Sequence, residues 1–242
     1  MILKVPQVTI FFWIIKLLST AMGESTSDYL VFHISPFIAV FLGVIGLVIA
    51  LGLQLWVKKY IAWVYWLTVI MVAIFGTMAA DVLHVGLGIP YIISTAIFSV
   101  TLIVVFALWY RVEKTLSIHS ITTTRRELFY WATVMTTFAL GTAAGDMTAA
   151  TLGLGYLLSG VLFILLFLVP LIGYKKLHWN VVFSFWFAYV ITRPLGASFA
   201  DFLGKSALGG LGLGDEIVSV VLTVLIIILV GYLSITKKDI GE

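Results

Sequence analysis

Eight apolar runs of about twenty residues constrain the fold of this chain more than any other feature. They cover approximately residues 7–28, 36–56, 61–83, 90–110, 128–149, 155–174, 180–203 and 216–236. A helix of roughly 20 residues, rising 1.5 Å per residue, crosses the roughly 30 Å hydrocarbon core of a bilayer. Because 62% of the 242 residues are hydrophobic and only 10% are charged, little sequence remains for a soluble domain. We predict an all-α integral membrane protein with eight transmembrane helices in a single membrane domain, residues 1–242.

Basic residues at the ends of these runs predict an orientation, because cytoplasmic loops retain Lys and Arg whereas exported loops are depleted in them. Lys205 lies on one side of the eight-span arrangement. The basic residues on the other side are Lys4, Lys58, Lys59, Arg111, Lys114, Arg125, Arg126, Lys175, Lys176, Lys237 and Lys238. We therefore expect both termini in the cytoplasm, with the lipid bilayer as a partner and no nucleic-acid partner. The absence of cysteine excludes thiolate metal ligands and disulfides.

A sixteen-residue motif occurs four times without gaps. The copies are WIIKLLSTAMGESTSD (13–28), WLTVIMVAIFGTMAAD (66–81), WATVMTTFALGTAAGD (131–146) and WFAYVITRPLGASFAD (186–201). Each copy is Trp, nine residues, Gly, four residues and Asp, and a plainer apolar run follows it. The chain thus contains four two-helix repeats, approximately 1–59, 60–114, 125–177 and 178–238. An even number of spans per copy makes the repeats parallel. They predict a pseudo-symmetric bundle, either four units around one axis or two pairs forming two halves.

These four units, with the flanking segments KVPQVTIFFWIIK, GTMAADVLHVGLG, GTAAGDMT and TRPLGASFAD, resemble a family of bacterial integral membrane proteins. Its members are described as uncharacterised membrane-anchored proteins built from a repeat of unknown function. The resemblance covers nearly the whole chain and implies a protein of the bacterial inner (cytoplasmic) membrane. It supplies no activity and no catalytic residues, so function has to be argued from the side chains.

The repeated aspartates predict a polar layer inside the bundle. Each Asp follows its Trp by fifteen residues, or about 22 Å along a helix. With the Trp side chains anchored at the cytoplasmic interface, the aspartates lie at one depth in the outer part of the membrane. All charged groups of the motif helices fall within one third of the helix circumference, and this arc should face the interior because charge facing lipid is costly. These groups are Asp28, Asp81, Asp146, Asp201, Glu24, His84, Arg193 and Lys16.

The charge balance of this layer points to an ion pathway. Its five carboxylates face two bases, so three negative charges are uncompensated. Buried carboxylates without a partner either take up protons or recruit cations. The alternative is structural: each Asp caps the following segment or accepts hydrogen bonds from loop amides. Both interpretations stay open at this stage.

We identify the four aspartates, Glu24 and His84 as candidate metal ligands, and Arg193 and Lys16 as charge-balancing or gating residues. Asp81 and His84 have i, i+3 spacing, which suits a borderline metal such as manganese or zinc. Glu24 and Arg193 would pair if the four units close a ring, either as a structural ion pair or as a gate. Lys16, near the inner face, could instead extend its ammonium group to the membrane surface.

These observations favour a transporter of a small divalent cation, with manganese(II) as the preferred ion and export as the preferred direction. The metal would be a substrate, with no permanently bound cofactor, and a homo-oligomer is compatible with the sequence. The alternatives are a proton-coupled carrier of a small organic solute and a non-transporting membrane receptor or scaffold. We do not expect an enzyme, because no nucleophile, base and oxyanion site are brought together.

Overall fold

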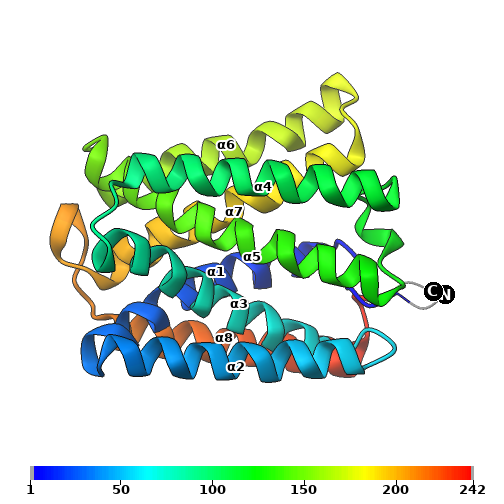
Figure 1. Ribbon diagram of the computed structural model, residues 1–242, viewed down its shortest axis with the longest axis horizontal. Coiled ribbons are helices and arrows are strands. Elements are labelled where there is room, and N and C mark those ends of the chain that lie inside the picture. The colour runs from blue at the N-terminus through cyan, green and yellow to red at the C-terminus, as the bar shows by residue number, and fades with distance from the viewer. Residues whose placement is uncertain (1–2, 241–242) are drawn as a thin grey trace.

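Within residues 3–240, which the computed structural model describes, the chain forms eight long α-helices and no β-strand, which confirms the all-α class. The helices are α1 (Ile10–His33), α2 (Pro36–Trp56), α3 (Ala62–Asp81), α4 (Tyr91–Glu113), α5 (Thr124–Asp146), α6 (Gly155–Leu177), α7 (Val181–Gly204) and α8 (Asp215–Thr236). Two π-helical segments, η1 (Val82–Gly86) and η3 (Met147–Thr151), directly follow α3 and α5. The 3₁₀ segments η2 (Ile118–Ser120) and η4 (Ala207–Gly209) lie in connections. The bundle is elongated, and both chain ends lie at the same end of it (Figure 1).

The helix bounds lie within four residues of the predicted ones except at the end of the first run. Run 7–28 was too short at one side, because α1 begins at Ile10 and continues to His33. The hydroxyl of Thr9 caps its start by accepting a hydrogen bond from the main-chain N–H of Phe12. Its end is set by Pro36, since residues before a proline avoid the helical conformation. Asp28 therefore lies inside α1 and not at its last residue.

Six of the eight helices are long and apolar enough to cross a membrane, and α1 and α5 are not among them. Both are less apolar than the rest, because α1 carries Lys16, Glu24 and Asp28 while α5 begins with two arginines and a glutamate. The number of long helices thus equals the eight predicted spans. Six of these helices have the length and composition of a membrane span.

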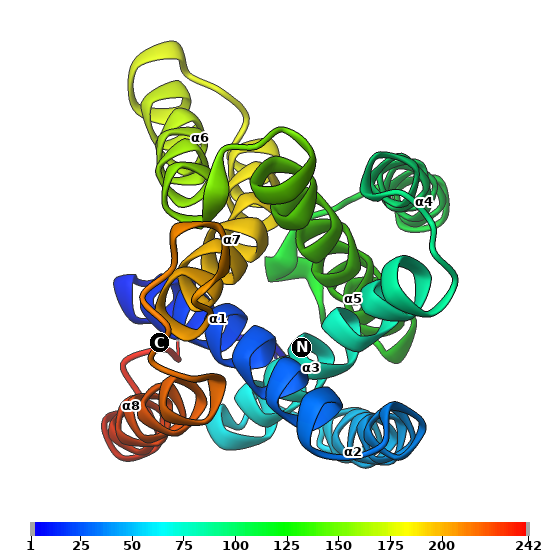
Figure 2. The same ribbon diagram turned by 90° about the vertical axis from the view of Figure 1, so that its left-hand side faces the viewer.

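The four odd-numbered helices, which carry the repeated motif, form a closed ring. α1 packs on α3, α3 on α5, α5 on α7, and α7 returns to α1 (Figure 2). Of the two arrangements that the repeats allow, the structure adopts four units around one axis.

The glycine of each motif explains how closely these inner helices approach. A methyl group added at Gly23 would overlap Ala73 of the next inner helix, and one at Gly76 would overlap Phe138. The same holds for Gly141 against Arg193, and for Gly196 of the fourth copy against Thr20 of the first. Each of these neighbours stands seven residues after the Trp of its own motif. The motif glycine therefore forms the close contact between neighbouring inner helices at each of the four interfaces of the ring.

The even-numbered helices surround this ring, and each packs mainly on the inner helix of the following repeat. α2 lies on α3, α4 on α5 and α6 on α7, while α8 lies on α1 and so joins the last repeat to the first (Figure 2). Their outward faces carry large exposed apolar side chains, such as Phe37, Phe41 and Ile227 at 88%, 64% and 64% exposure. The sides of the bundle are thus apolar, whereas charged residues such as Lys16, Glu24 and Arg193 are buried inside it.

Aromatic side chains fill the ring at the end near the chain termini. Each motif Trp is preceded by Phe or Tyr, and these four residues are buried: Phe12, Tyr65, Tyr130 and Phe185. Tyr65 and Tyr130 are hydrogen-bonded to each other through their hydroxyls. Trp66, Trp131 and Trp186 also belong to this core, so the prediction that the motif tryptophans face a membrane interface was wrong for these three. They pack inward because the neighbouring aromatic rings cover them.

Candidate functional site

The predicted acidic residues converge at the end of the ring opposite to the chain termini, where they form two clusters. Carboxylate oxygens of Glu24, Asp28 and Asp201 lie within 4.8 Å of one another. Ligand atoms of Asp81, His84 and Asp146 lie equally close together. The first cluster joins α1 and α7, and the second joins α3 and α5, so each combines adjacent helices of the ring.

None of the four aspartates acts as a helix cap or as an acceptor for loop amides. Asp81 and Asp146 precede the π-helical segments, yet neither side chain makes a capping hydrogen bond. Among the described residues, no main-chain N–H donates to Asp28 or Asp201 either. The described hydrogen bonds therefore give no support to the structural alternative of repeated caps: α1 and α7 continue past Asp28 and Asp201, and α3 and α5 pass directly into η1 and η3 after Asp81 and Asp146 without a side-chain cap.

Arg193 lies at the centre of the ring and connects all four inner helices. Its guanidinium group forms an ion pair with Glu24 at 2.6 Å, which confirms the predicted pairing. It also donates to the hydroxyls of Thr77 and Thr142, the latter at 2.7 Å, and to the carbonyl of Thr20 at 3.1 Å. Glu24, Thr77 and Thr142 occupy the same motif position in the first three repeats. The arginine of the fourth repeat therefore donates hydrogen bonds to the equivalent residue of each of the other three repeats.

Lys205, which the sequence placed in an outer loop, neutralises the first cluster. Its ammonium nitrogen lies 2.8 Å from Asp28 and 2.7 Å from Asp201. Burial disfavours the charged form of Lys205, but the carboxylates of Asp201 and Asp28 outweigh this effect and hold its pKa above the ordinary value. The only sequence signal was the i, i+4 spacing from Asp201 to Lys205, which is common on helix surfaces.

Lys16 lies elsewhere, so its predicted role as a counter-charge for the acidic layer was wrong. It is fully buried, and its ammonium group lies over the rings of Phe138 and Tyr189, 4.1 Å and 4.4 Å from their centroids. Within the described chain this nitrogen has no hydrogen-bond acceptor, and it does not reach a surface. Arg193 and Lys205 are the bases that contact the layer, so five carboxylates still face two bases.

The second cluster forms no ion pair with a lysine or arginine of the described chain. Asp81 forms no hydrogen bond or ion pair with any residue in the described range. The contact of Asp146 is with His84, whose Nδ1 lies 3.8 Å from a carboxylate oxygen, which is too long for a hydrogen bond. Both aspartates are partly exposed, whereas His84 is buried at 8% exposure. Two carboxylates are thus held beside an imidazole without a lysine or arginine in direct contact with them in the described chain.

The first turn of α4 orients this imidazole. Nε2 of His84 lies 2.6 Å from the hydroxyl of Ser94, and the ring of Tyr91 packs against it edge to face. Ser94 has one hydroxyl hydrogen, which it donates to the carbonyl of Tyr91 at 3.0 Å. In the arrangement where the Ser94 hydroxyl donates to this carbonyl, Nε2 carries the hydrogen of the His84–Ser94 bond and Nδ1 keeps a free lone pair. This nitrogen is buried without a hydrogen-bond partner in the described chain and lies 3.8 Å from a carboxylate oxygen of Asp146, as in a metal ligand oriented by a neighbouring hydroxyl.

The π-helical turns distinguish the two middle repeats from the outer ones. In η1 and η3 the hydrogen bonds skip one more residue, as from Leu87 to Val82 at 2.9 Å and from Leu152 to Met147 at 2.9 Å. Such wider turns are frequent at functional sites. Both repeats also share a Tyr-x-x-Ser segment, Tyr91 with Ser94 and Tyr156 with Ser159. This segment is a signal that could have identified Ser94 from the sequence.

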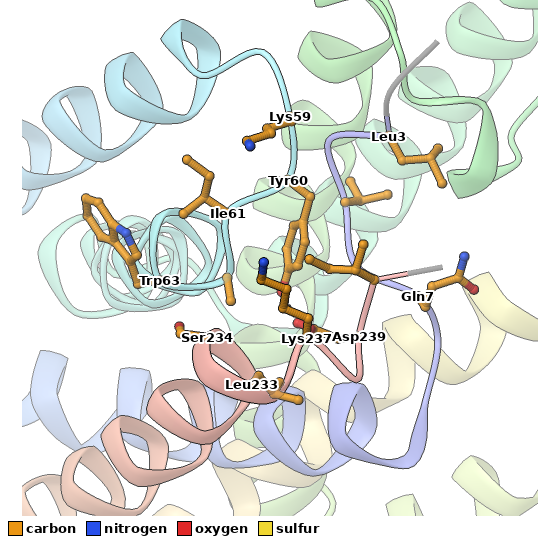
Figure 3. A pocket seen from close by; sticks show the side chains of 13 residues that line it. Leu3, Gln7, Lys59, Tyr60, Ile61, Trp63, Leu233, Ser234, Lys237 and Asp239 are labelled. Atoms are coloured by element: carbon orange, nitrogen blue, oxygen red, sulfur yellow. The ribbon is translucent and has the colours of Figure 1, made fainter. Parts of the chain in front are cut away.

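A cavity of about 680 Å³ lies far from these clusters, at the end that carries the termini. Lys59, Tyr60 and Lys237 line it together with Asp239, as Figure 3 shows. The hydroxyl of Tyr60 donates to Asp239. Burial raises the pKa of the Asp239 carboxyl, and this hydrogen bond opposes the shift. None of the predicted site residues lies in this cavity.

Comparison with family models matches four segments of the chain to the description Repeat of Unknown Function (DUF347), at residues 11–60, 64–115, 129–177 and 184–239. These matches coincide with the four predicted copies. No curated protein and no solved structure is significantly similar to the chain.

Proposed function

This chain belongs to the DUF347 repeat family, and from the site that its four repeats build we propose that it transports a small divalent cation, with manganese(II) the preferred ion. The observation that carries the proposal is the second cluster. There Asp81, Asp146 and His84 offer three ligand atoms within 4.8 Å of one another, and no lysine or arginine of the described chain forms an ion pair with the carboxylates.

The charge and chemistry of these ligands favour a divalent ion of hard or borderline character. Two carboxylates are neutralised by one ion of charge two, which relieves the repulsion between two unpaired acidic groups held close together. Carboxylate oxygens suit magnesium, calcium and manganese, and an imidazole nitrogen shifts the preference toward transition metals. Manganese(II) accepts both kinds of ligand.

The exposed apolar sides support placing the bundle in a membrane with all eight helices spanning it. The outer helices would face lipid, and they would shield α1 and α5, which carry the charges. Basic residues gather at the end of the termini, which we assign to the cytoplasmic side of the bacterial inner membrane. The acidic clusters then lie toward the outer side.

Access to the site favours an outward-facing arrangement. Asp81 and Asp146 are partly exposed, whereas the buried aromatic residues and Lys16 close the ring toward the cytoplasmic end. An ion moving from the cytoplasm would have to pass this aromatic closure. Export, the direction that we prefer, therefore requires the inner helices to separate at Phe12, Tyr65, Tyr130 and Phe185.

The test measures manganese binding by the purified protein in detergent and manganese flux in proteoliposomes. We expect the wild type to bind Mn²⁺ and to gain thermal stability from it. Asp81→Asn and Asp146→Asn should lose both effects. Glu216→Gln is the matched control, since it neutralises a carboxylate of the first turn of α8 outside both clusters.

Binding and flux that are equal in the wild type and both Asn variants would overturn the proposal. Stabilisation by an organic solute without metal would favour the proton-coupled carrier. A protein that binds and moves neither would favour a receptor or scaffold.

A further inference from the structure

The two halves of the acidic layer are chemically unequal, and we infer that Lys205 is a built-in cation that occupies one half. The wild type then takes a single divalent ion, between Asp81 and Asp146, and loss of Lys205 would open a second divalent site between Asp28 and Asp201. This inference rests on the proposed cation binding at Asp81, His84 and Asp146.

The repeat makes the two halves comparable. All four aspartates are the last residue of the same motif, and each half takes two of them from adjacent inner helices of one closed ring. In one half, the ammonium of Lys205 lies between the two carboxylates at 2.8 Å and 2.7 Å. In the other half no lysine or arginine of the described chain forms an ion pair with Asp81 or Asp146. Lys205 thus places a positive charge, tethered to the chain, in direct contact with one pair of aspartates and not with the other.

The loop after α7 holds Lys205 in place. Its main-chain N–H donates to the carbonyl of Asp201 at 2.9 Å, and its carbonyl accepts from Gly212 at 3.1 Å. Leu213 and Gly214 bond back to Leu203 and Gly204, so the loop folds over the end of α7. A methyl group on Gly210 would overlap the Lys205 carbonyl. These main-chain contacts fix the backbone of Lys205. The position of its ammonium group is set by the ion pairs with Asp28 and Asp201.

Removing the ammonium leaves a ligand set for a hard divalent cation. Asp28 and Asp201 would regain an uncompensated charge, with an oxygen of Glu24 within 4.8 Å of theirs. Glu24 is held by Arg193, which keeps it from collapsing onto the vacated position. Oxygen ligands alone, without an imidazole, suit magnesium, calcium and manganese alike. We therefore expect the new site to discriminate less between these ions than the site with His84.

The experiment counts manganese ions per chain by equilibrium dialysis and elemental analysis of the full-length protein. We expect one ion in the wild type, two in Lys205→Met, and one in Lys205→Arg, which keeps the charge. Combining Lys205→Met with Asp201→Asn should return the count to one, at the site with His84. Lys205→Gln serves as a second neutral variant, since it retains a hydrogen-bond donor for the carboxylates if the Met variant does not fold.

The outcomes separate this inference from the proposed function. One ion in both the wild type and the neutral variants would overturn the role of Lys205 and leave the proposed site intact. No ion in the wild type but one in Lys205→Met would support the role of Lys205 and contradict the proposed site. No ion in any folded variant would overturn both.

Discussion

At the scale of single residues, the orientation of His84 depends on one hydroxyl group. Ser94→Ala removes the acceptor for Nε2–H, so the ring is free to rotate and Nδ1 no longer faces the carboxylates. Loss of such supporting partners costs about 10–100-fold in metal affinity. We expect a decrease of this size in Mn²⁺ affinity, measured by titration of the purified protein, with little change in thermal stability.

The third repeat provides the control for this variant. Ser159 occupies the position of Ser94, but Ala149 stands where the second repeat has His84. The hydroxyl of Ser159 is buried and has no hydrogen-bond partner among the described residues. Ser159→Ala should therefore leave Mn²⁺ affinity unchanged. Equal losses in the two Ser variants would show that the hydroxyl of Ser94 acts through packing and not through the imidazole.

A second residue-scale prediction concerns the buried pair at the opposite end. Tyr60→Phe removes the hydroxyl that donates to Asp239, so the pKa of this carboxyl should rise further. A carboxyl with a raised folded-state pKa contributes stability that is present at low pH and lost as pH rises through that pKa. We expect Tyr60→Phe to cost about 1–3 kcal/mol at neutral pH.

The pH dependence checks that sign. The difference in melting temperature between Tyr60→Phe and the wild type should shrink as pH falls toward 4, because Asp239 becomes protonated. Tyr232→Phe, at an exposed hydroxyl, should change little at any pH. A deficit that grows on acidification would contradict this account.

Residue patterns predicted the acidic members of the site but not the groups that support them. Repetition identified the four aspartates, and spacing paired Glu24 with Arg193. Lys205 was missed because it lies beyond the helix, and only the folded-back loop directs it inward. Lys16 was misassigned because helical periodicity predicts which face of a helix a residue lies on, but not which side chains of neighbouring helices surround it. Here they are the aromatic rings of Phe138 and Tyr189.

At the scale of helices, close packing of the ring depends on the motif glycines. Gly141→Ala would place a methyl group into the side chain of Arg193, which bonds to Glu24 and Thr142. Overpacking of this kind typically costs about 1–3 kcal/mol. We expect a lower melting temperature in detergent and, because the shift passes through Arg193, weaker Mn²⁺ binding as well.

Gly52 on α2 is the matched control, since a methyl group there meets nothing within 4 Å. Gly52→Ala should be neutral or stabilising by up to about 1 kcal/mol, because alanine favours helix more than glycine does. If Gly141→Ala is as stable as Gly52→Ala, the repeated glycine does not set the spacing of the ring.

At the scale of the whole molecule, the sequence predicted four parallel two-helix units but could not choose their arrangement. Four units around one axis and two pairs forming two halves would both bury the same face of the motif helices. The difference between them lies in which inner helix each outer helix packs against. In the structure each outer helix packs on the following repeat, and α8 packs on α1. The ring is thus closed by contacts between the ends of the chain, which no local pattern encodes.

Closure predicts that the chain order can be changed without changing the fold. Both termini lie at one end, where Gln7 N–H donates to the carbonyl of Asp239 at 2.9 Å and Tyr60 N–H to that of Leu3 at 3.0 Å. A short Gly/Ser linker can therefore join them, and new termini can be placed at residues 115–117, between the second and third repeats. Every repeat contributes an even number of helices, so the permuted chain keeps the orientation of all eight.

We expect this permutant to be folded in detergent and to bind Mn²⁺ with the stoichiometry of the wild type. A second permutant, opened at residues 87–89, cuts the connection that brings Tyr91 and Ser94 back to His84. It should retain the helical bundle, measured by circular dichroism, but bind Mn²⁺ at least about 10-fold more weakly. If both permutants fail to fold, the contact between α8 and α1 does not close the ring as an equivalent of the other three.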